Sequence, residues 1–191
     1  MSHVSILGTG NMGPAIASLV TKGGNTVELF NSSDTDKQIT GDIVILAVPY
    51  PSVAKVAAER GDQLAGKVVV DITNPLNFET FDSLTVPADS SATAEIAAKL
   101  PQSRVLKAFN TNFAATLNSG TVGTEPTTVL IAGDDAEAKA LLAGIVSAGG
   151  LKAADAGSLK RARELEALAF LQMTLAAGEK ISWTGGFAVI A

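Results

Sequence analysis

Three glycines near the amino terminus have the spacing of a loop that holds a phosphate. They follow the apolar run 4–7 and precede a helix-forming stretch at 14–22. In such a unit the first glycine permits a tight turn, the second lets the backbone approach a pyrophosphate, and the third lets helix and strand pack together. Free N–H groups at the helix start attract the anion. We therefore predict a dinucleotide-binding loop, made of Gly8, Thr9, Gly10, Asn11, Met12 and Gly13.

The tip of the second predicted strand indicates which nicotinamide dinucleotide fits. An acidic residue about 20 positions after the glycines normally holds the ribose 2′-OH of NAD. Here the tip reads Asn31, Ser32 and Ser33, which can donate hydrogen bonds to a 2′-phosphate that a carboxylate would repel. We predict NADP, with NAD less favoured. No arginine lies nearby in the sequence, although Lys37 could contribute, and a turn that merely ends the strand is the alternative.

Neutral polar side chains and prolines follow the next three predicted strands. The carboxyl ends of parallel strands share one edge of a sheet, where ligands bind. We expect the cofactor to contact Ala47, Val48, Pro49, Tyr50, Thr73, Asn74 and Pro75. We expect the second substrate to contact Asn77, Lys107, Asn110, Thr111 and Asn112. The alternative is that these asparagines and prolines only form turns.

Side chains that could transfer a proton are scarce at this edge. The single histidine, His3, precedes the first strand and so lies at the opposite end of the sheet. Lys107 could orient a substrate or extend to solvent, and Asp71 could be a structural acceptor. The charged stretch 160–166, Glu166 included, is typical of a solvated helix start with a Lys160–Glu164 pair. We predict no catalytic acid or base and no metal site. Hydride transfer between two ring systems needs mainly close stacking, so the pattern favours it over alcohol oxidation.

The elements that must position these residues alternate between strand and helix. Short β-branched runs predict parallel strands at 4–7, 26–30, 42–48, 67–72 and 104–108, with a sixth strand at 127–132. Helical stretches lie at 14–22, 51–63, 92–100, 134–148 and 158–179. This alternation predicts an α/β fold, a Rossmann-type doubly wound and mostly parallel sheet.

The connection between the second and third strands is unusually short. Only residues 32–41 are available, whereas the usual dinucleotide fold has a helix and a strand in this interval. The chain must cross beside the first strand, a path of about 20–25 Å. Ten extended residues span about 33 Å, but ten helical residues only about 15 Å. We therefore predict an extended crossover, with one βα unit missing from the sheet edge.

The composition suits one globular domain. Of the 191 residues, 47% are hydrophobic and 17% charged, enough to bury a sizeable core. The net charge of −5 and the lack of a basic stripe argue against nucleic acid as a partner, and no cysteine is present for disulfide or thiolate chemistry. No apolar run approaches the roughly 18–20 residues of a membrane span, and the first strand begins too early to leave room for a secretory signal. We expect a cytoplasmic protein without membrane contact.

The carboxyl-terminal stretch 158–191 reads as an appendage of a single domain that spans residues 1–191. Its helix carries an apolar stripe, and its tail carries the only tryptophan, Trp183. The stripe consists of Leu165, Leu168, Ala169, Gln172 and Leu175. We expect this part to cover the ligand or to pair with a second copy in a homodimer.

Five segments, in this order, resemble the NADPH-dependent reductases of coenzyme F420, a deazaflavin, and their dinucleotide-binding relatives. The segments are 8–13 (GTGNMG), 42–49 (DIVILAVP), 69–77 (VVDITNPLN), 105–111 (VLKAFNT) and the helix 159–175. The cytosolic reductase domains of membrane metalloreductases are similar. The resemblance implies that Thr9, Asn11 and Met12 join the phosphate loop, that 31–33 hold the adenosine phosphate, and that Val48, Pro49, Asn74 and Pro75 lie along the nicotinamide. The chain departs from the family pattern in the missing arginine and in the short 32–41 connection.

The sequence thus predicts an NADP-dependent oxidoreductase that exchanges a hydride with a small redox acceptor. The neutral edge favours a flavin-like ring as the acceptor, the resemblance implies coenzyme F420, and a quinone or a metal chelate stays open. A protein of another class, a nucleotide-sensing module without turnover, would show the same glycine loop.

Overall fold

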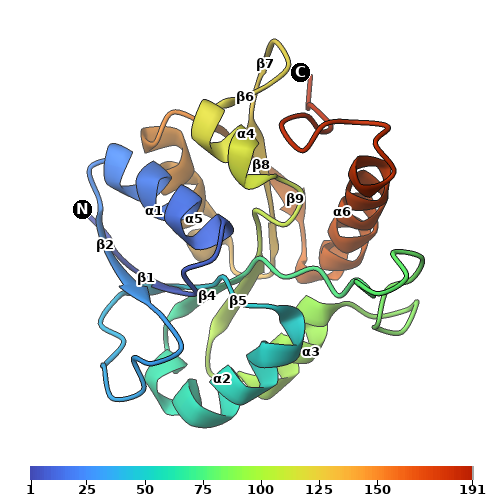
Figure 1. The fold of residues 1–191 in the computed structure, drawn as a ribbon. Coiled ribbons are helices and arrows are strands. Elements are labelled where there is room, and N and C mark those ends of the chain that lie inside the picture. Colours follow the sequence, from blue (N-terminus) through green and yellow to red (C-terminus); the bar gives the residue numbers. More distant parts are fainter. Residues whose placement is uncertain (191) are drawn as a thin grey trace.

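The computed structural model describes residues 1–190, which form a sheet covered by helices on both faces (Figure 1). The sheet has seven strands in the order β2-β1-β3-β4-β5-β8-β9. Its strands are β1 (His3–Leu7), β2 (Thr26–Phe30), β3 (Ile43–Leu46), β4 (Val68–Asp71), β5 (Arg104–Lys107), β8 (Thr128–Gly133) and β9 (Lys152–Gly157). The helices are α1 (Met12–Lys22), α2 (Tyr50–Leu64), α3 (Ala92–Lys99), α4 (Ala114–Ser119), α5 (Ala136–Ala148) and α6 (Ala162–Ala177).

The five strands from β1 to β5 run parallel, as the sequence predicts. Every residue of β3 and β4 is buried, because helices cover both faces of the central sheet. One apolar core lies between the sheet and α1, α4 and α5, and a second lies between the sheet and α2 and α3. The predicted doubly wound α/β fold is therefore confirmed.

The short crossover is also confirmed. β1 lies between its two partners, with Val4 paired to Val27 of β2 on one side and to Ile43 of β3 on the other. The connecting residues 32–41 contain neither helix nor strand. An extended path suffices because the chain has to pass only β1 before it joins the sheet again.

The carboxyl-terminal half contains elements that the sequence analysis missed. β8 pairs antiparallel with β5, and the unpredicted β9 runs parallel to β8 at the edge of the sheet. β9 has the sequence KAADAG, which has no β-branched residue, so its pairing with β8 rather than its local propensity fixes it as a strand. The short α4 ends at Gly120 in the left-handed conformation (φ 78°) and leads into the hairpin of β6 (Thr121–Val122) and β7 (Glu125–Pro126).

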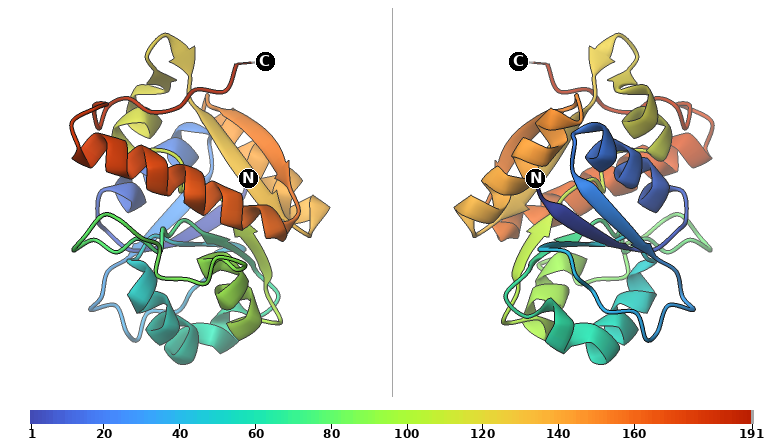
Figure 2. Two further views of the ribbon diagram at one scale, coloured as in Figure 1. Left: turned by 90° about the vertical axis from the view of Figure 1, so that its right-hand side faces the viewer. Right: turned by 90° about the vertical axis from the view of Figure 1, so that its left-hand side faces the viewer.

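The helix α6 follows a 3-10 turn at Leu159–Arg161 and lies beside the sheet, where Figure 2 shows it running across the molecule. Its buried face differs by part of a turn from the predicted stripe, because it includes Glu166 while Leu168 and Leu175 are only partly covered. The buried residues are Ala162, Leu165, Glu166, Ala169, Gln172 and Ala176. Within residues 1–190, no helix has both the length and the apolar character needed to cross a membrane.

Candidate functional site

The glycine loop between β1 and α1 is packed tightly at both ends and open in the middle. Gly8 has φ +124°, and a Cβ there would lie 2.1 Å from the carbonyl oxygen of Ala47. A Cβ on Gly13 would lie 2.0 Å from the carbonyl oxygen of Gly8, whereas one on Gly10 would meet no atom within 4 Å. Only Gly10 therefore leaves open space in front of the loop, which is where an anion can approach.

The start of α1 is free to bind that anion. Asn11, at the N-cap position, makes no side-chain hydrogen bond to the helix, and the first turn carries no acidic residue. The first N–H groups of a helix have no partner within the helix and carry a partial positive charge. The loop thus has the geometry and the electrostatics of a pyrophosphate site.

A first cavity of about 400 Å³ lies on one side of the loop, between β1, β2 and α2. It collects predicted residues from three separate segments, together with side chains of α2. Its lining is Leu7, Gly8, Thr9, Gly10, Phe30, Asn31, Ser32, Thr35, Ala47, Val48, Pro49, Ser52, Lys55, Val56, Glu59 and Arg60.

The tip of β2 presents hydrogen-bonding groups but no carboxylate to this cavity. The Asn31 Oδ1 atom accepts hydrogen bonds from the Ser33 backbone N–H at 2.7 Å and from its hydroxyl at 2.5 Å. Both donors of Ser33 are therefore occupied within the turn, and Ser33 does not line the cavity. Asn31 and Ser32 do line it. The Asp34 carboxylate accepts from the Asn31 N–H at 2.8 Å and is likewise absent from the lining.

Arg60 is a functional candidate that the sequence analysis missed. It lies on α2, lines the first cavity, and is only 9% exposed. Its guanidinium donates to the backbone carbonyls of Lys37 at 2.8 Å, Thr35 at 3.2 Å and Asp34, and so fixes the crossover beside the β2 tip. Its position in the sequence could have indicated this role. Arg60 follows the core residue Val53 by seven positions, which places it on the buried face of α2. A charged side chain on such a face requires partners.

Lys37 does not take the place predicted for it. Its ammonium lies 4.1 Å from the centre of the Phe30 ring and donates to the Leu29 carbonyl at 3.1 Å. Lys37 is not part of the cavity lining. The basic groups that do line the cavity, Lys55 and Arg60, both come from α2.

A second cavity of about 460 Å³ lies on the other side of the loop. The Trp183 ring of the tail lines it, with its centre 5.0 Å from that of Phe113. None of the residues that line it carries an ionisable side chain. They are Asn11, Met12, Ile72, Asn74, Phe109, Asn110, Asn112, Phe113, Ala114, Ala115, Met173 and Trp183.

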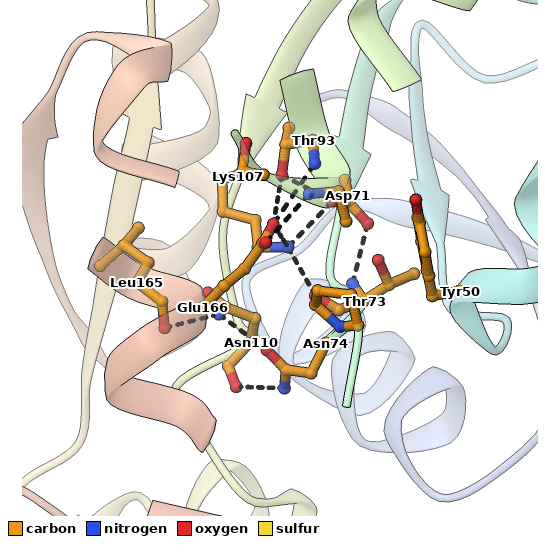
Figure 3. A network of polar contacts seen from close by, with 12 residues as sticks. Tyr50, Asp71, Thr73, Asn74, Thr93, Lys107, Asn110, Leu165 and Glu166 are labelled. Atoms are coloured by element: carbon orange, nitrogen blue, oxygen red, sulfur yellow. Dashed lines mark hydrogen bonds and ion pairs between the residues drawn. The ribbon is translucent and has the colours of Figure 1, made fainter. Parts of the chain in front are cut away.

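Three of the predicted asparagines meet at this second cavity. The Asn74 amide donates to the Asn110 backbone carbonyl at 3.0 Å, and the Asn110 amide donates to Asn74 Oδ1 at 3.0 Å. Asn110 also donates to the Leu165 carbonyl of α6 at 3.0 Å, and Asn112 donates to the Thr128 carbonyl at 3.0 Å. The structure therefore joins the ends of β4 and β5 to α6 through neutral amides, as drawn in part in Figure 3.

Lys107 is not placed for the substrate contact that the sequence analysis expected, and it does not extend to solvent. Its side chain has no exposed surface and forms ion pairs of 2.9 Å with Asp71 and with Glu166 (Figure 3). It also donates to the Thr73 carbonyl at 2.5 Å. A buried ammonium needs such partners. Lys107 is therefore part of the protein interior at the end of β5.

Glu166 corrects the prediction of a solvated helix start. It is 1% exposed, and its carboxylate accepts hydrogen bonds from the backbone N–H groups of Ala92 at 2.9 Å and Thr93 at 3.3 Å. It thus binds the first turn of α3 as well as Lys107. At the exposed start of α6 the ion pair is Arg161–Glu164 at 3.6 Å, not the predicted Lys160–Glu164.

Four further predicted residues lie outside both cavity linings. Thr73 is buried, with its N–H on Asp71 at 2.8 Å, and Pro75 is buried, with its carbonyl bound to Thr85. Asn77 caps its own loop, since its Oδ1 accepts from the Glu79 N–H at 3.0 Å. Thr111 accepts at its carbonyl from Gln172 at 3.0 Å. Turn formation therefore accounts for Asn77, and packing accounts for the other three.

Tyr50 opens α2 and also lies outside the two linings. Its hydroxyl donates to the Glu95 carboxylate of α3 at 2.5 Å. Burial, and then this hydrogen bond and the negative charge of Glu95, raise the pKa of Tyr50 above its usual value of 10.0. The hydroxyl stays protonated at neutral pH and links α2 to α3.

Sequence comparison links this arrangement to known proteins. The sequence model of the family described as "NADP oxidoreductase coenzyme F420-dependent" matches residues 32–75. The F420-dependent NADP reductase of Methanocaldococcus jannaschii is 29% identical over 168 residues, or 85% of this chain and 74% of that protein. The resemblance read from the sequence is thereby confirmed. The chain is thus similar in sequence to F420-dependent NADP oxidoreductases.

Other similar proteins differ in length or are known by structure. The metalloreductase STEAP3 of Rattus norvegicus is 34% identical over 182 residues, but the chain spans only 36% of its length. A candidate F420-dependent NADP reductase from Arthrobacter sp. FB24 matches over 100% of both chains, with a TM-score of 0.87 and 23% identity. A Sinorhizobium meliloti protein, SMa0349, matches over 83% of this chain and 86% of its own, with a TM-score of 0.70 and 27% identity.

Proposed function

We propose that this protein is an NADP-dependent oxidoreductase that transfers a hydride between NADPH and a planar ring acceptor in the second cavity. The observation that carries the proposal is the lining of that cavity, which contains asparagines, aromatic and aliphatic side chains but no ionisable group. Such a lining can hold and orient two stacked rings, and it offers no acid or base for the reduction of a carbonyl.

The two cavities suit the two ends of the dinucleotide. The open space at Gly10 and the free start of α1 would hold the pyrophosphate, and the first cavity would take the adenosine half. The nicotinamide would then enter beside Met12 and the Asn74–Asn110 pair. When bound, the reduced nicotinamide supplies a proton with two electrons from one C–H bond, and the acceptor forms the new bond to that hydrogen.

The β2 tip supports NADP over NAD. Asn31 and Ser32 line the first cavity, and no carboxylate of this tip does. We expect Asn31→Asp to shift the preference from NADPH toward NADH about tenfold, since a carboxylate repels the 2′-phosphate and can accept from a ribose hydroxyl. The exposed Asn118 on α4 provides a control, because Asn118→Asp makes the same charge change elsewhere. Equal affinities of the unaltered protein for NADPH and NADH would contradict the assignment.

The acceptor is proposed as coenzyme F420 or a flavin. The names of two relatives support a panel of acceptors, since one is an F420-dependent NADP reductase and the other a metalloreductase. The neutral, partly aromatic second cavity of about 460 Å³ favours a ring system over a charged metal chelate.

The test is a turnover assay with purified protein and NADPH. Loss of the reduced-nicotinamide absorbance is followed with coenzyme F420, FMN, a quinone and a ferric chelate in turn. We expect turnover with the deazaflavin or the flavin. Tight NADPH binding without oxidation by any acceptor would instead indicate a nucleotide-sensing module.

The homodimer through α6 stays a prediction. Leu171 on the outer face of α6 is 51% exposed, and so is available for contact with a second copy. Light scattering of the purified protein checks this, and a monomeric mass would contradict it.

A further inference from the structure

The buried cluster next to the second cavity contains unequal numbers of positive and negative groups. Lys107 contributes one ammonium, while Asp71 and Glu166 contribute two carboxylates, and all three side chains are at most 1% exposed. Figure 3 shows them at the meeting point of β4, β5, α3 and α6. The cluster therefore has an excess of one negative charge in the interior.

Every group of the cluster already has its hydrogen-bond partners, so it needs no ligand of its own. Lys107 uses its three donors on Asp71, Glu166 and the Thr73 carbonyl. The Thr93 hydroxyl donates to Asp71 at 2.7 Å, and the start of α3 donates to Glu166. The partial positive charge of this helix start stabilises the excess charge where it is.

The cluster directly underlies the lining of the second cavity. Asp71 precedes the lining residue Ile72, and the Thr73 carbonyl that binds Lys107 precedes the lining residue Asn74. Glu166 follows Leu165, whose carbonyl holds Asn110. The lining itself carries no charge, and the cluster lies directly behind the residues assigned to the nicotinamide.

We propose that the excess negative charge of the Asp71–Lys107–Glu166 cluster makes the protein bind the oxidised nicotinamide more tightly, relative to the reduced one, than it would without that charge. This inference rests on the proposed function. Oxidation of the dihydronicotinamide removes a hydride and leaves one positive charge on the ring. A negative charge in a poorly screened interior stabilises that cation and hardly affects the neutral reduced ring. The cluster thus favours the oxidised form of the bound nicotinamide over the reduced form.

The test is the ratio of two dissociation constants, that for NADP⁺ divided by that for NADPH. Glu166→Gln removes one negative charge and nearly preserves the shape, so we expect the ratio to rise roughly three- to tenfold. Asp71→Asn removes the other carboxylate and should change the ratio in the same direction. Titration calorimetry measures both constants. If a variant is destabilised, the difference between the thermal shifts given by the two nucleotides reports the same ratio.

The matched control is Glu164→Gln, on the same helix and with the same change in net charge, but with its side chain 49% exposed. We expect no change in its ratio. A ratio within twofold of the unaltered protein in Glu166→Gln and Asp71→Asn would overturn the inference, and so would an equal rise in Glu164→Gln. Failure of the unaltered protein to bind either nucleotide would instead contradict the proposed function.

Discussion

The two cavities beside the glycine loop differ in whether charged side chains line them. The lining of the first includes Lys55, Glu59 and Arg60, whereas the lining of the second contains no ionisable side chain. Each has a buried cation nearby. Arg60 binds three backbone carbonyls, and Lys107 binds two carboxylates. The first lining therefore offers charged groups to a ligand, whereas the second offers neutral amides, aromatic rings and aliphatic side chains.

The largest expected effect separates the two buried cations. Lys107→Met leaves two carboxylates buried without their partner, and should lower the free energy of unfolding by about 3–5 kcal/mol. Arg60→Met leaves only neutral carbonyls without a donor, and should cost less, about 1–3 kcal/mol. Urea unfolding of both variants measures this. Equal losses would remove the contrast between the two sides.

A second prediction concerns the open middle of the glycine loop. Gly10→Ala should weaken NADPH binding at least about tenfold, which corresponds to about 1.4 kcal/mol, because the new Cβ fills the space left for the phosphates. The melting temperature should stay nearly unchanged, since that Cβ meets no protein atom within 4 Å.

The control for this change is Gly144→Ala on α5, where a Cβ also meets nothing within 4 Å. It should leave NADPH binding unaltered and stabilise the helix by about 1 kcal/mol. Normal NADPH affinity in Gly10→Ala would place the pyrophosphate elsewhere.

A third prediction tests the assignment of the second cavity to the acceptor. Trp183→Ala removes the ring that packs on Phe113 and should raise the KM for the acceptor about fivefold, since aromatic pairs contribute about 0.5–1.5 kcal/mol. Steady-state kinetics with the acceptor found in the panel measures it. The dissociation constant of NADPH should change much less. An equal loss for both ligands would mean that the tail covers the nucleotide.

The smallest expected effect is at Tyr50, which lies outside both cavity linings. Its pKa is raised in the folded protein, so the folded state keeps the proton that the unfolded state loses above pH 10. Its contribution to stability is therefore complete below pH 10 and declines as the pH rises further. Tyr50→Phe should cost about 1 kcal/mol at neutral pH and flatten the alkaline decline in melting temperature. An alkaline decline as steep as that of the unaltered protein would show that another group causes it.

Local patterns predicted the first half of the fold well. The glycine spacing, the β-branched runs and the ten-residue crossover each allow few structures, because chain length and strand geometry restrict the path of the chain. The sequence did not predict β9, because KAADAG has little strand propensity of its own. Its pairing with β8 comes from tertiary structure.

The sequence predicted which segments form the candidate site, but not which charged residues belong to it. Asn74, Asn110 and Asn112 meet as expected, because strands that end at one edge bring the following residues together. Arg60 and Glu166 were missed, although both lie on buried faces of helices. A charged residue on such a face indicates a buried partner, but its sequence position does not tell which one.

The sequence by itself determined the dinucleotide loop, the parallel sheet and the neutral polar edge, because these depend on residue type and short-range spacing. Only the tertiary structure decided that Lys107 is buried between Asp71 and Glu166, which lie 36 and 59 positions away along the chain. The reason is physical: the solvation of a charge depends on what folds around it, and that is a property of the packed chain rather than of any segment.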